Sequence, residues 1–212
     1  MYKLHCFAQS GNAYKVALML SLVNEPWEPV LVDFFNGAAR SPEFLENLNE
    51  FGEVPVLIDG ATTLTQSAVM LDYLSSKHGK FGATSADMRR EILRWLFWDN
   101  HKLTANVATG RFMTNFLPEK NRNADVIAFL MGRAKTAMTI LEKHLDGRDW
   151  IVGEEMSIAD LSCVGYMYYT DEIDVDMAQF PNISRWRDAI AALPGWKHPY
   201  DLMPGHPLPV KS

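Results

Sequence analysis

The chain has little cysteine and no long hydrophobic run. Cys6 and Cys163 are its only cysteines among 212 residues, they stand far apart in apolar surroundings, and no Cys-x-x-Cys occurs. A dithiol redox motif is therefore excluded, and both residues are predicted to be buried thiols in a reducing cytoplasm. No apolar run approaches the ~18 residues of a membrane span, and Met1-Tyr2-Lys3 leads directly into a strand-like pattern instead of a signal peptide. We expect a cytoplasmic protein without a membrane partner.

The chain also lacks an excess of basic residues and the common metal and nucleotide motifs. Its 20 Lys and Arg against 26 Asp and Glu give a net charge of −6, which argues against non-specific nucleic-acid binding. The six histidines show no metal-ligand spacing, and neither Gly-x-Ser-x-Gly nor a phosphate loop appears. Apolar residues make up 48% of the chain, enough for the core of one or two domains. We expect no nucleic acid and no metal among its ligands.

The most informative stretch is a predicted hairpin that leads into a helix. Val54 to Ile58 has the length of a strand, and Pro55 near its start lacks an N–H for a ladder, which places it at an edge or a special turn. Asp59-Gly60 predicts a two-residue type I′ turn before the Thr-rich run 61–65. Helical spacing follows, so Gln66-Ser67 open a helix N-terminus, which suits a carboxylate.

The remaining pattern divides the chain into an α/β part and a helical part. Over the first 78 residues the order is β-α-β-α-β-β-α, with strands at 2–7 and 28–33, a helix at 14–23 and a short helix from Ser41-Pro42. Helices are then predicted at about 86–116, 122–145, 158–170 and 182–193, with a capping box at Ser157–Asp160. We expect an α/β domain at 1–80 and an all-α domain at 84–212, whose Pro-rich tail at 199–209 is not helical.

Four ordered motifs carry a family resemblance that covers nearly the whole chain. They are Ser10-Gly11-Asn12-Ala13-Tyr14-Lys15-Val16, Gly52-Glu53-Val54-Pro55-Val56-Leu57, Gln66-Ser67, and Gly153 with Ser157-Ile158-Ala159-Asp160. With these motifs the chain resembles the cytosolic glutathione transferases. The resemblance implies a thioredoxin-like glutathione-binding domain followed by the all-α domain, and a homodimer in which Phe51 is a candidate aromatic plug into the partner. Phe51 covering its own domain is the alternative.

The resemblance also implies which residues bind glutathione. Ser67, with its hydroxyl and its N–H at a helix start, suits the γ-glutamyl carboxylate, and Gln66 can present its amide to the same end. The backbone of Val54, before a Pro55 expected to be cis, can pair with the cysteinyl amide as one strand pairs with another. Arg40 is the candidate partner of the glycyl carboxylate.

Ser10 is the candidate catalytic residue, at the end of the first strand and the start of the first helix. A hydroxyl there can donate to the glutathione sulfur, and the helix dipole favours the same negative charge. Phe7 and Ala8 stand where the tyrosine classes place their hydroxyl, and Cys6 lacks the context of the thiol-transferring classes. The chain therefore looks like a bacterial serine-type enzyme, theta- or phi-like. Asn12, which is polar and close by, is the alternative thiolate donor.

The chain departs from the family pattern at three binding positions. Glu53 stands where many relatives have Lys or Gln, so a cation expected near the glycyl end is missing. Gln66 replaces an acidic residue of many serine-type classes, which weakens an ammonium contact. Ala39 fills the place of a glutathione-binding His in some of them.

The electrophile site is less well defined by the sequence. Trp98, His101, Arg111 and Phe112 lie on the long predicted helix that faces the active site in the family, and they are the candidate substrate residues. The alternative is that Trp98 belongs to the core and that His101 is a structural hydrogen-bonder. The resemblance implies conjugation of glutathione to a small hydrophobic electrophile. Peroxidase activity on organic hydroperoxides and a non-catalytic dimeric binder are the alternatives.

Overall fold

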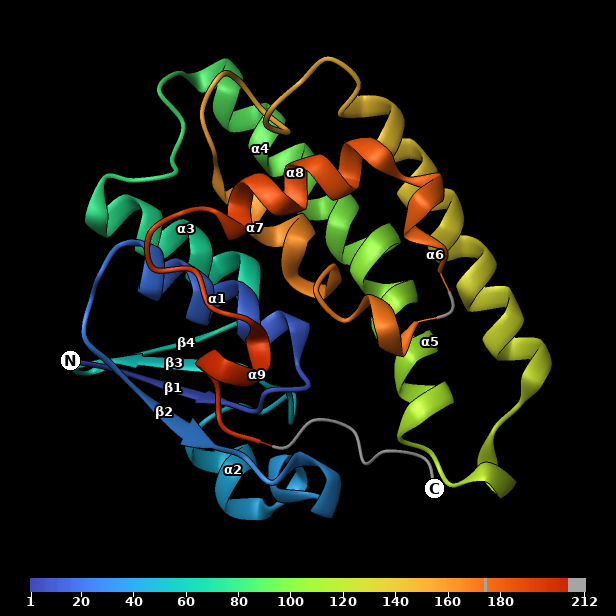
Figure 1. The fold of residues 1–212 in the computed structure, drawn as a ribbon. Helices are drawn as coiled ribbons and strands as arrows, with labels where there is room; N and C mark the ends of the chain where they lie inside the picture. Colours follow the sequence, from blue (N-terminus) through green and yellow to red (C-terminus); the bar gives the residue numbers. More distant parts are fainter. Residues whose placement is uncertain (174, 206–212) are drawn as a thin grey trace. The chain divides into compact units, whose positions relative to one another are not determined.

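The computed structural model describes residues 1–173 and 175–205, which form two compact units (Figure 1). The first unit contains Met1–Lys80 and Leu193–Gly205, and the second contains the described residues of Phe81–Ala192. The sequence pattern assigned the chain beyond residue 193 to the helical domain, whereas in the structure Leu193–Gly205 packs with the α/β unit. The reason lies in three hydrogen bonds from α1 and the turn before it to backbone carbonyls of that segment, described below.

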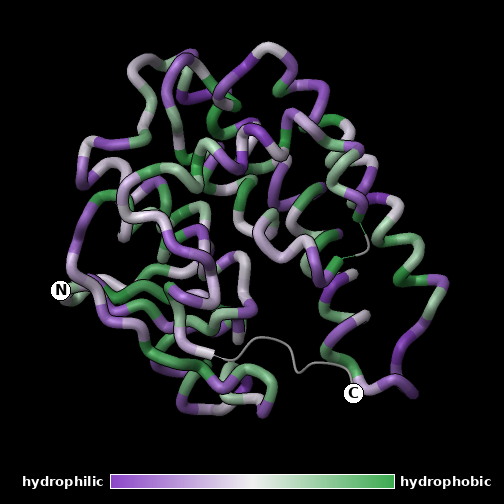
Figure 2. Tube along the Cα trace, in the orientation of Figure 1, coloured by the Kyte–Doolittle hydropathy of each residue, from purple (hydrophilic) through white to green (hydrophobic). Residues whose placement is uncertain are grey.

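The first unit contains a four-stranded mixed sheet in the order β2-β1-β3-β4. Its strands are β1 (Tyr2–Cys6), β2 (Trp27–Leu31), β3 (Val56–Asp59) and β4 (Thr62–Thr65). β1 pairs in parallel with β2, while the β1–β3 and β3–β4 pairs are antiparallel. This arrangement confirms the predicted β-α-β-α-β-β-α order. Figure 2 shows hydrophobic stretches along the strands.

The hairpin turn lies one residue later than predicted. Asp59 pairs with Thr62, so the two loop residues are Gly60 and Ala61 and not Asp59-Gly60. Gly60 has a φ of 60°, whereas Ala61 has no positive φ, which is the type II′ pattern and not type I′. Asp59 stays in the strand because its carboxylate accepts hydrogen bonds from Tyr73 and Lys77 of the following helix.

Three helices accompany this sheet. α1 (Gly11–Leu22) and α3 (Ser67–His78) lie on one side of it and α2 (Pro42–Asn47) on the other (Figure 1). α1 begins three residues before the predicted Tyr14 because the Ser10 side chain caps it. α2 begins as expected, with Ser41 accepting from the Phe44 N–H and with Pro42 in the first turn.

The second unit is helical, as predicted, but its first long helix is interrupted. α4 (Ala86–Trp98) passes through a π-helical turn, Asp99–Leu103, into α5 (Thr104–Asn115). The π turn buries the Asp99 carboxylate, which accepts the hydroxyls of Thr104 at 2.8 Å and Ser162 at 2.6 Å. A buried carboxylate needs such partners, and meeting them interrupts the regular helix. The later helices are α6 (Ala124–His144), α7 (Ile158–Cys163) and α8 (Pro181–Ala191).

The predicted capping box at the start of α7 is confirmed. Ser157 Oγ accepts from the Ala159 N–H at 3.2 Å, and Asp160 Oδ2 accepts from the Ser157 N–H at 2.8 Å. Asp160 Oδ1 also accepts from the Ile151 N–H and the Trp186 Nε1–H, each at 2.9 Å. The box therefore joins α7 to the preceding loop and to α8. α7 itself is shorter than the predicted 158–170, because the chain tightens to a 3₁₀ turn at Val164–Tyr166.

The segment Leu193–Gly205 is held by α1 and by the turn before it. Tyr14 Oη donates to the Lys197 carbonyl at 2.9 Å, Ser21 Oγ donates to the Gly195 carbonyl, and the Ala8 N–H donates to the Pro204 carbonyl at 2.7 Å. α9 (Pro199–Leu202) corrects the expectation of a wholly non-helical tail. Its proline stands at the first helical position, which needs no N–H. Residues 206–209 of that predicted tail lie outside the described residues.

Within 1–173 and 175–205, none of the helices has the length and apolarity required to cross a membrane. No group of three or more His, Cys, Asp and Glu side chains in the same ranges is arranged to hold a metal ion.

Candidate functional site

Ser10 occupies the predicted place between β1 and α1. Its N–H donates to the Phe7 carbonyl at 3.0 Å, which closes the turn after the strand. Its Oγ accepts from the Ala13 N–H at 3.1 Å and so caps α1. The residue is only 6% exposed. Because a hydroxyl can accept through a lone pair and still donate its own hydrogen, the cap leaves Ser10 able to donate to a ligand atom.

Asn12 and Ser67 meet at the first turns of α1 and α3. The Ser67 hydroxyl donates to Asn12 Oδ1 at 3.5 Å, and Ser67 is buried with 4% exposure. The bond turns the oxygen of the Asn12 amide toward α3, so the NH₂ group is the end that can donate to a ligand. The structure thus brings a predicted catalytic residue into contact with a predicted binding residue.

Gln66 has a strained backbone at the start of α3. Its φ is 68°, a left-handed value that is uncommon outside glycine and that often marks functional sites. Among the described residues no side chain caps α3, so its N-terminus remains available to an anion. Gln66 Nε2 donates to Glu53 Oε2 at 2.9 Å. Sequence analysis identified Glu53 only as a departure from the family pattern. No local sequence spacing links positions 53 and 66, so their hydrogen bond was not predicted.

The segment before β3 has the expected geometry, with a cis peptide between Val54 and Pro55. Asn49, which was not singled out from the sequence, fixes this segment. Its Nδ2 donates to the Glu53 carbonyl at 2.8 Å, and its Oδ1 accepts from the Phe51 N–H at 3.1 Å. Asn49 is 4% exposed, so a buried amide holds the backbone that presents Val54.

Arg40 lies against the same segment. Its Nη1 donates to the Phe51 carbonyl at 3.4 Å. Gly52 next to it has a φ of 62°, and a Cβ there would approach the Ala39 carbonyl oxygen to 2.9 Å. The close approach explains the glycine and keeps the exposed Arg40 guanidinium beside the loop that leads to Val54.

Cys6 is buried in β1, as predicted. Burial raises the pKa of its thiol to about 12, so the thiol stays protonated at neutral pH. Because the thiolate is the nucleophilic form, Cys6 cannot serve as a nucleophile at this site.

Three aromatic rings beside the Ser10 turn were not predicted. Phe7 stacks on Phe34 with centroids 4.8 Å apart and meets Phe35 edge-on at 5.6 Å. Phe34 lies in the 3₁₀ turn Phe34–Asn36 that follows β2, and Phe35 is 46% exposed. The adjacent Phe34-Phe35 pair is the only signal in the sequence that could have found them. They form an apolar cluster around Phe7, whose carbonyl accepts from the Ser10 N–H.

The candidate electrophile residues lie on the interrupted helix of the second unit. Trp98 is partly buried against Trp95, with centroids 4.9 Å apart, and His101 is exposed in the π turn. Phe112 is 36% exposed. Arg111, in contrast, is only 3% exposed, and its guanidinium donates from Nε and Nη2 to the Glu172 carboxylate. Arg111 is thus committed to an ion pair inside its own unit.

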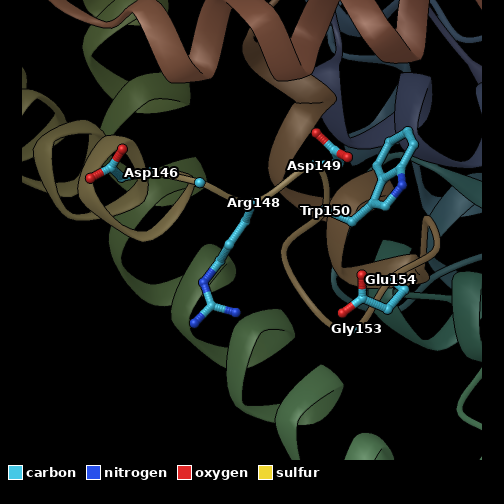
Figure 3. A pocket seen from close by; sticks show the side chains of 7 residues that line it. Asp146, Arg148, Asp149, Trp150, Gly153 and Glu154 are labelled. Carbon is cyan, nitrogen blue, oxygen red and sulfur yellow. The ribbon is translucent and has the colours of Figure 1, made fainter.

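A polar hollow of about 270 Å³ lies in the loop between α6 and α7 (Figure 3). None of the predicted site residues lines it. Acidic side chains and one arginine dominate its wall, which does not suit an apolar electrophile. The lining residues are Asp146, Gly147, Arg148, Asp149, Trp150, Gly153 and Glu154.

Comparison with known proteins gives one consistent family. Residues 4–82 match the model of the glutathione S-transferase N-terminal domain, and residues 104–194 match that of the C-terminal domain. Disulfide-bond oxidoreductase YfcG of Escherichia coli strain K12 is 26% identical over 195 residues, 89% of each chain. A crystal structure of glutathione S-transferase from Pseudomonas fluorescens is 30% identical with a TM-score of 0.87, covering 94% of this chain and 99% of that one. A glutathione transferase from Burkholderia graminis, solved with two glutathione molecules per subunit, is 26% identical with a TM-score of 0.80, covering 92% and 85%.

Proposed function

Because the chain belongs to the glutathione S-transferase family, we propose that it binds glutathione in its first unit, ionises the thiol and transfers it to small hydrophobic electrophiles. The observation that carries this proposal is the contact between Asn12 and Ser67, two residues from the cap Ser10. The candidate hydrogen-bond donors to the thiolate and the candidate site for a carboxylate therefore lie next to each other in the first unit.

Each part of glutathione has a partner of matching chemistry. Ser67 and the uncapped N-terminus of α3 take the γ-glutamyl carboxylate, with the amide of Gln66 beside it. The backbone of Val54, held in place through Asn49, pairs with the cysteinyl amide. Arg40 takes the glycyl carboxylate, and no metal takes part in this scheme.

Ionisation of the thiol needs no formal base. A free thiol has a pKa of about 8.5, and lowering it by about two units requires ~2.7 kcal/mol of preferential thiolate stabilisation. One good hydrogen bond from Ser10 to the sulfur supplies ~1.5–3 kcal/mol, and the α1 N-terminus adds ~0.3–1 kcal/mol. Asn12 offers a second donor. The only cysteine of this region, Cys6, stays protonated and out of the reaction.

The electrophile is proposed to bind to the helical unit. Trp98, His101 and Phe112 remain the proposed contacts. Arg111 acts indirectly, by holding Glu172 and its loop. Its direct contact with substrate would require breaking a buried ion pair.

We propose a homodimer that works in the cytoplasm, where glutathione is reduced. Homodimers are typical of the family. Phe51, which is 54% exposed, is the proposed contact with the partner.

A second candidate function is reduction of small disulfides by two glutathione molecules. Two of the similar proteins favour this function. One is the disulfide-bond oxidoreductase of Escherichia coli, and the other is the Burkholderia graminis transferase that was solved with two bound glutathione molecules. One glutathione thiolate attacks the disulfide and releases a thiol. The second glutathione then attacks the mixed disulfide, which yields oxidised glutathione and a second thiol, so atoms and electrons balance. No protein cysteine is needed, in agreement with the buried Cys6.

Retention on immobilised glutathione tests the binding step. A panel of halo-aromatic, epoxide, isothiocyanate, hydroperoxide and small disulfide substrates then separates the activities. Turnover of the electrophiles supports the transferase, turnover of disulfides or hydroperoxides alone supports the reductive alternatives, and binding without turnover supports a non-catalytic binder. Failure to bind glutathione would overturn the proposal.

A further inference from the structure

A carboxylate and an amide are held together at the start of α3. Gln66 Nε2 donates to Glu53 Oε2 at 2.9 Å, although the residues lie 13 positions apart. Both side chains are exposed. Among the described residues Glu53 enters no ion pair, so its negative charge is not neutralised by a neighbouring Arg or Lys.

The backbones at both ends of this hydrogen bond are fixed. The Glu53 carbonyl accepts from the buried Asn49 amide at 2.8 Å. Gln66 lies between the end of β4 and the start of α3, and its carbonyl accepts from the Val69 and Met70 N–H groups at 3.0 and 3.1 Å. The carboxylate is therefore preorganised, and the hydrogen bond through Oε2 leaves Oε1 to accept from a ligand.

The neighbouring residue is the proposed carboxylate-binding Ser67. An α-amino acid carries its carboxylate and its ammonium on the same carbon. When its carboxylate is bound by Ser67, its ammonium therefore also lies close to Ser67. An ammonium has three donors and no acceptor, and its natural partner is a carboxylate. Gln66 cannot supply that charge, whereas Glu53 next to it can.

We propose that Glu53, positioned by Gln66, binds the α-ammonium of the γ-glutamyl residue and makes the site selective for thiols that carry a free α-amino acid end. The inference rests on the proposed glutathione site and deepens it. Gln66 itself is uncharged, so the negative charge beside the start of α3 comes from Glu53 in the loop before β3. If the Gln66–Glu53 bond merely ordered this loop, Glu53 would not discriminate between ligands with and without the amine.

Titration calorimetry at pH 7 with two thioethers tests this selectivity. The first probe is S-methylglutathione, and the second is its deaminated analogue, in which a glutaryl group replaces γ-glutamyl. The wild type is expected to bind the first about tenfold more tightly than the second, equivalent to ~1.4 kcal/mol. Glu53→Gln should reduce that ratio to about one while its affinity for the deaminated analogue is kept, which also shows that the variant is folded. Glu50→Gln, which removes one exposed negative charge three positions away, should keep the tenfold ratio.

Equal affinities in the wild type, or an unchanged ratio in Glu53→Gln, would overturn the inference while leaving glutathione binding intact. A wild type that binds neither probe would overturn the proposed function and this inference with it.

Discussion

The hydroxyl of Ser67 donates to the amide oxygen of Asn12 at 3.5 Å, across 55 positions of sequence. The bond joins the first turn of α3 to the first turn of α1, immediately after the cap at Ser10. Both helices begin at this contact, so their positive ends can stabilise the carboxylate and the thiolate of the proposed ligand together. We therefore expect substitutions of Ser10, Asn12 and Ser67 to have separable effects on the thiol and on the carboxylate.

Ser67→Ala should weaken glutathione binding by ~1.5–3 kcal/mol, because the single hydrogen of the Ser67 hydroxyl, which the free protein gives to Asn12 Oδ1, turns to the charged carboxylate when glutathione binds, and the variant lacks it. Titration calorimetry on wild type and variant measures the change. Ser76→Ala, an exposed serine on the same helix, is the matched control and should leave the dissociation constant as it is. An unchanged affinity in Ser67→Ala would mean that the γ-glutamyl end binds elsewhere.

Ser10→Ala should raise the pKa of bound glutathione by about one unit or more, with affinity little changed, because one donor to the sulfur is lost. The thiolate absorbance titration of the complex measures this. The same change removes the α1 cap, which costs ~1 kcal/mol of folding free energy, whereas Ser10→Gly costs only a few tenths. Both variants should raise the pKa of the bound glutathione thiol by the same amount. If only Asn12→Ala raises this pKa, the hydrogen-bond donor to the sulfur is Asn12.

Phe51→Ala should move the proposed homodimer toward monomer at low concentration. Its ring is 54% exposed in the first unit, and burial in a partner would be worth ~2 kcal/mol or more. Sedimentation velocity across a dilution series measures the shift. Phe129→Ala, which removes a 64% exposed ring from α6, is the control and should keep the dimer. A monomeric wild type at micromolar concentration would contradict the prediction.

Asp160→Ala should lower the free energy of unfolding by ~3 kcal/mol or more. The change leaves the N–H groups of Ile151, Ser157 and Trp186 without their acceptor in a buried site. Urea denaturation measures it. Asp188→Asn on the exposed face of α8 is the control, with an expected change within ~0.5 kcal/mol. Equal midpoints in wild type and Asp160→Ala would show that the box does not stabilise the folded state.

Features that depend on residues adjacent in the sequence were predictable. The hairpin before Gln66-Ser67 and the box at Ser157–Asp160 need only a few adjacent residues, whose propensities and caps act over one turn. Ser10 was likewise placed from its position between a strand and a helix. The hairpin turn itself was misplaced by one residue, because the contacts of Asp59 with Tyr73 and Lys77 come from outside the turn.

Features that depend on distant pairs were not predictable. The Gln66–Glu53 and Asn49–Glu53 bonds follow from the fold of a loop, and the Arg111–Glu172 pair joins residues 61 positions apart. Arg111 looked free to meet a substrate because its sequence neighbours say nothing of Glu172. The bound position of a hydrophobic electrophile depends on shape and is harder still to infer, since apolar side chains serve cores and binding sites alike.

Asp59→Asn should destabilise the first unit in a pH-dependent way. Asp59 accepts from Lys77 Nζ and from Tyr73 Oη, the latter at 2.6 Å, and these hydrogen bonds, led by that of Lys77, hold the pKa of Asp59 below its usual range. In the unfolded chain the carboxyl returns to about 3.9. The folded state then binds fewer protons than the unfolded state between the two values, so its stability rises with pH there.

The contribution of Asp59 to the free energy of unfolding is therefore fully present above about pH 4. It is lost as the pH falls through the lowered pKa of Asp59 in the folded state. Urea midpoints of wild type and Asp59→Asn should differ at pH 7, by ~1 kcal/mol in unfolding free energy, and converge below that range. Asp171→Asn, at an exposed position, should follow the wild type at every pH. A difference that stays constant down to pH 2 would show that Asp59 contributes through packing and hydrogen bonding alone, and not through its charge.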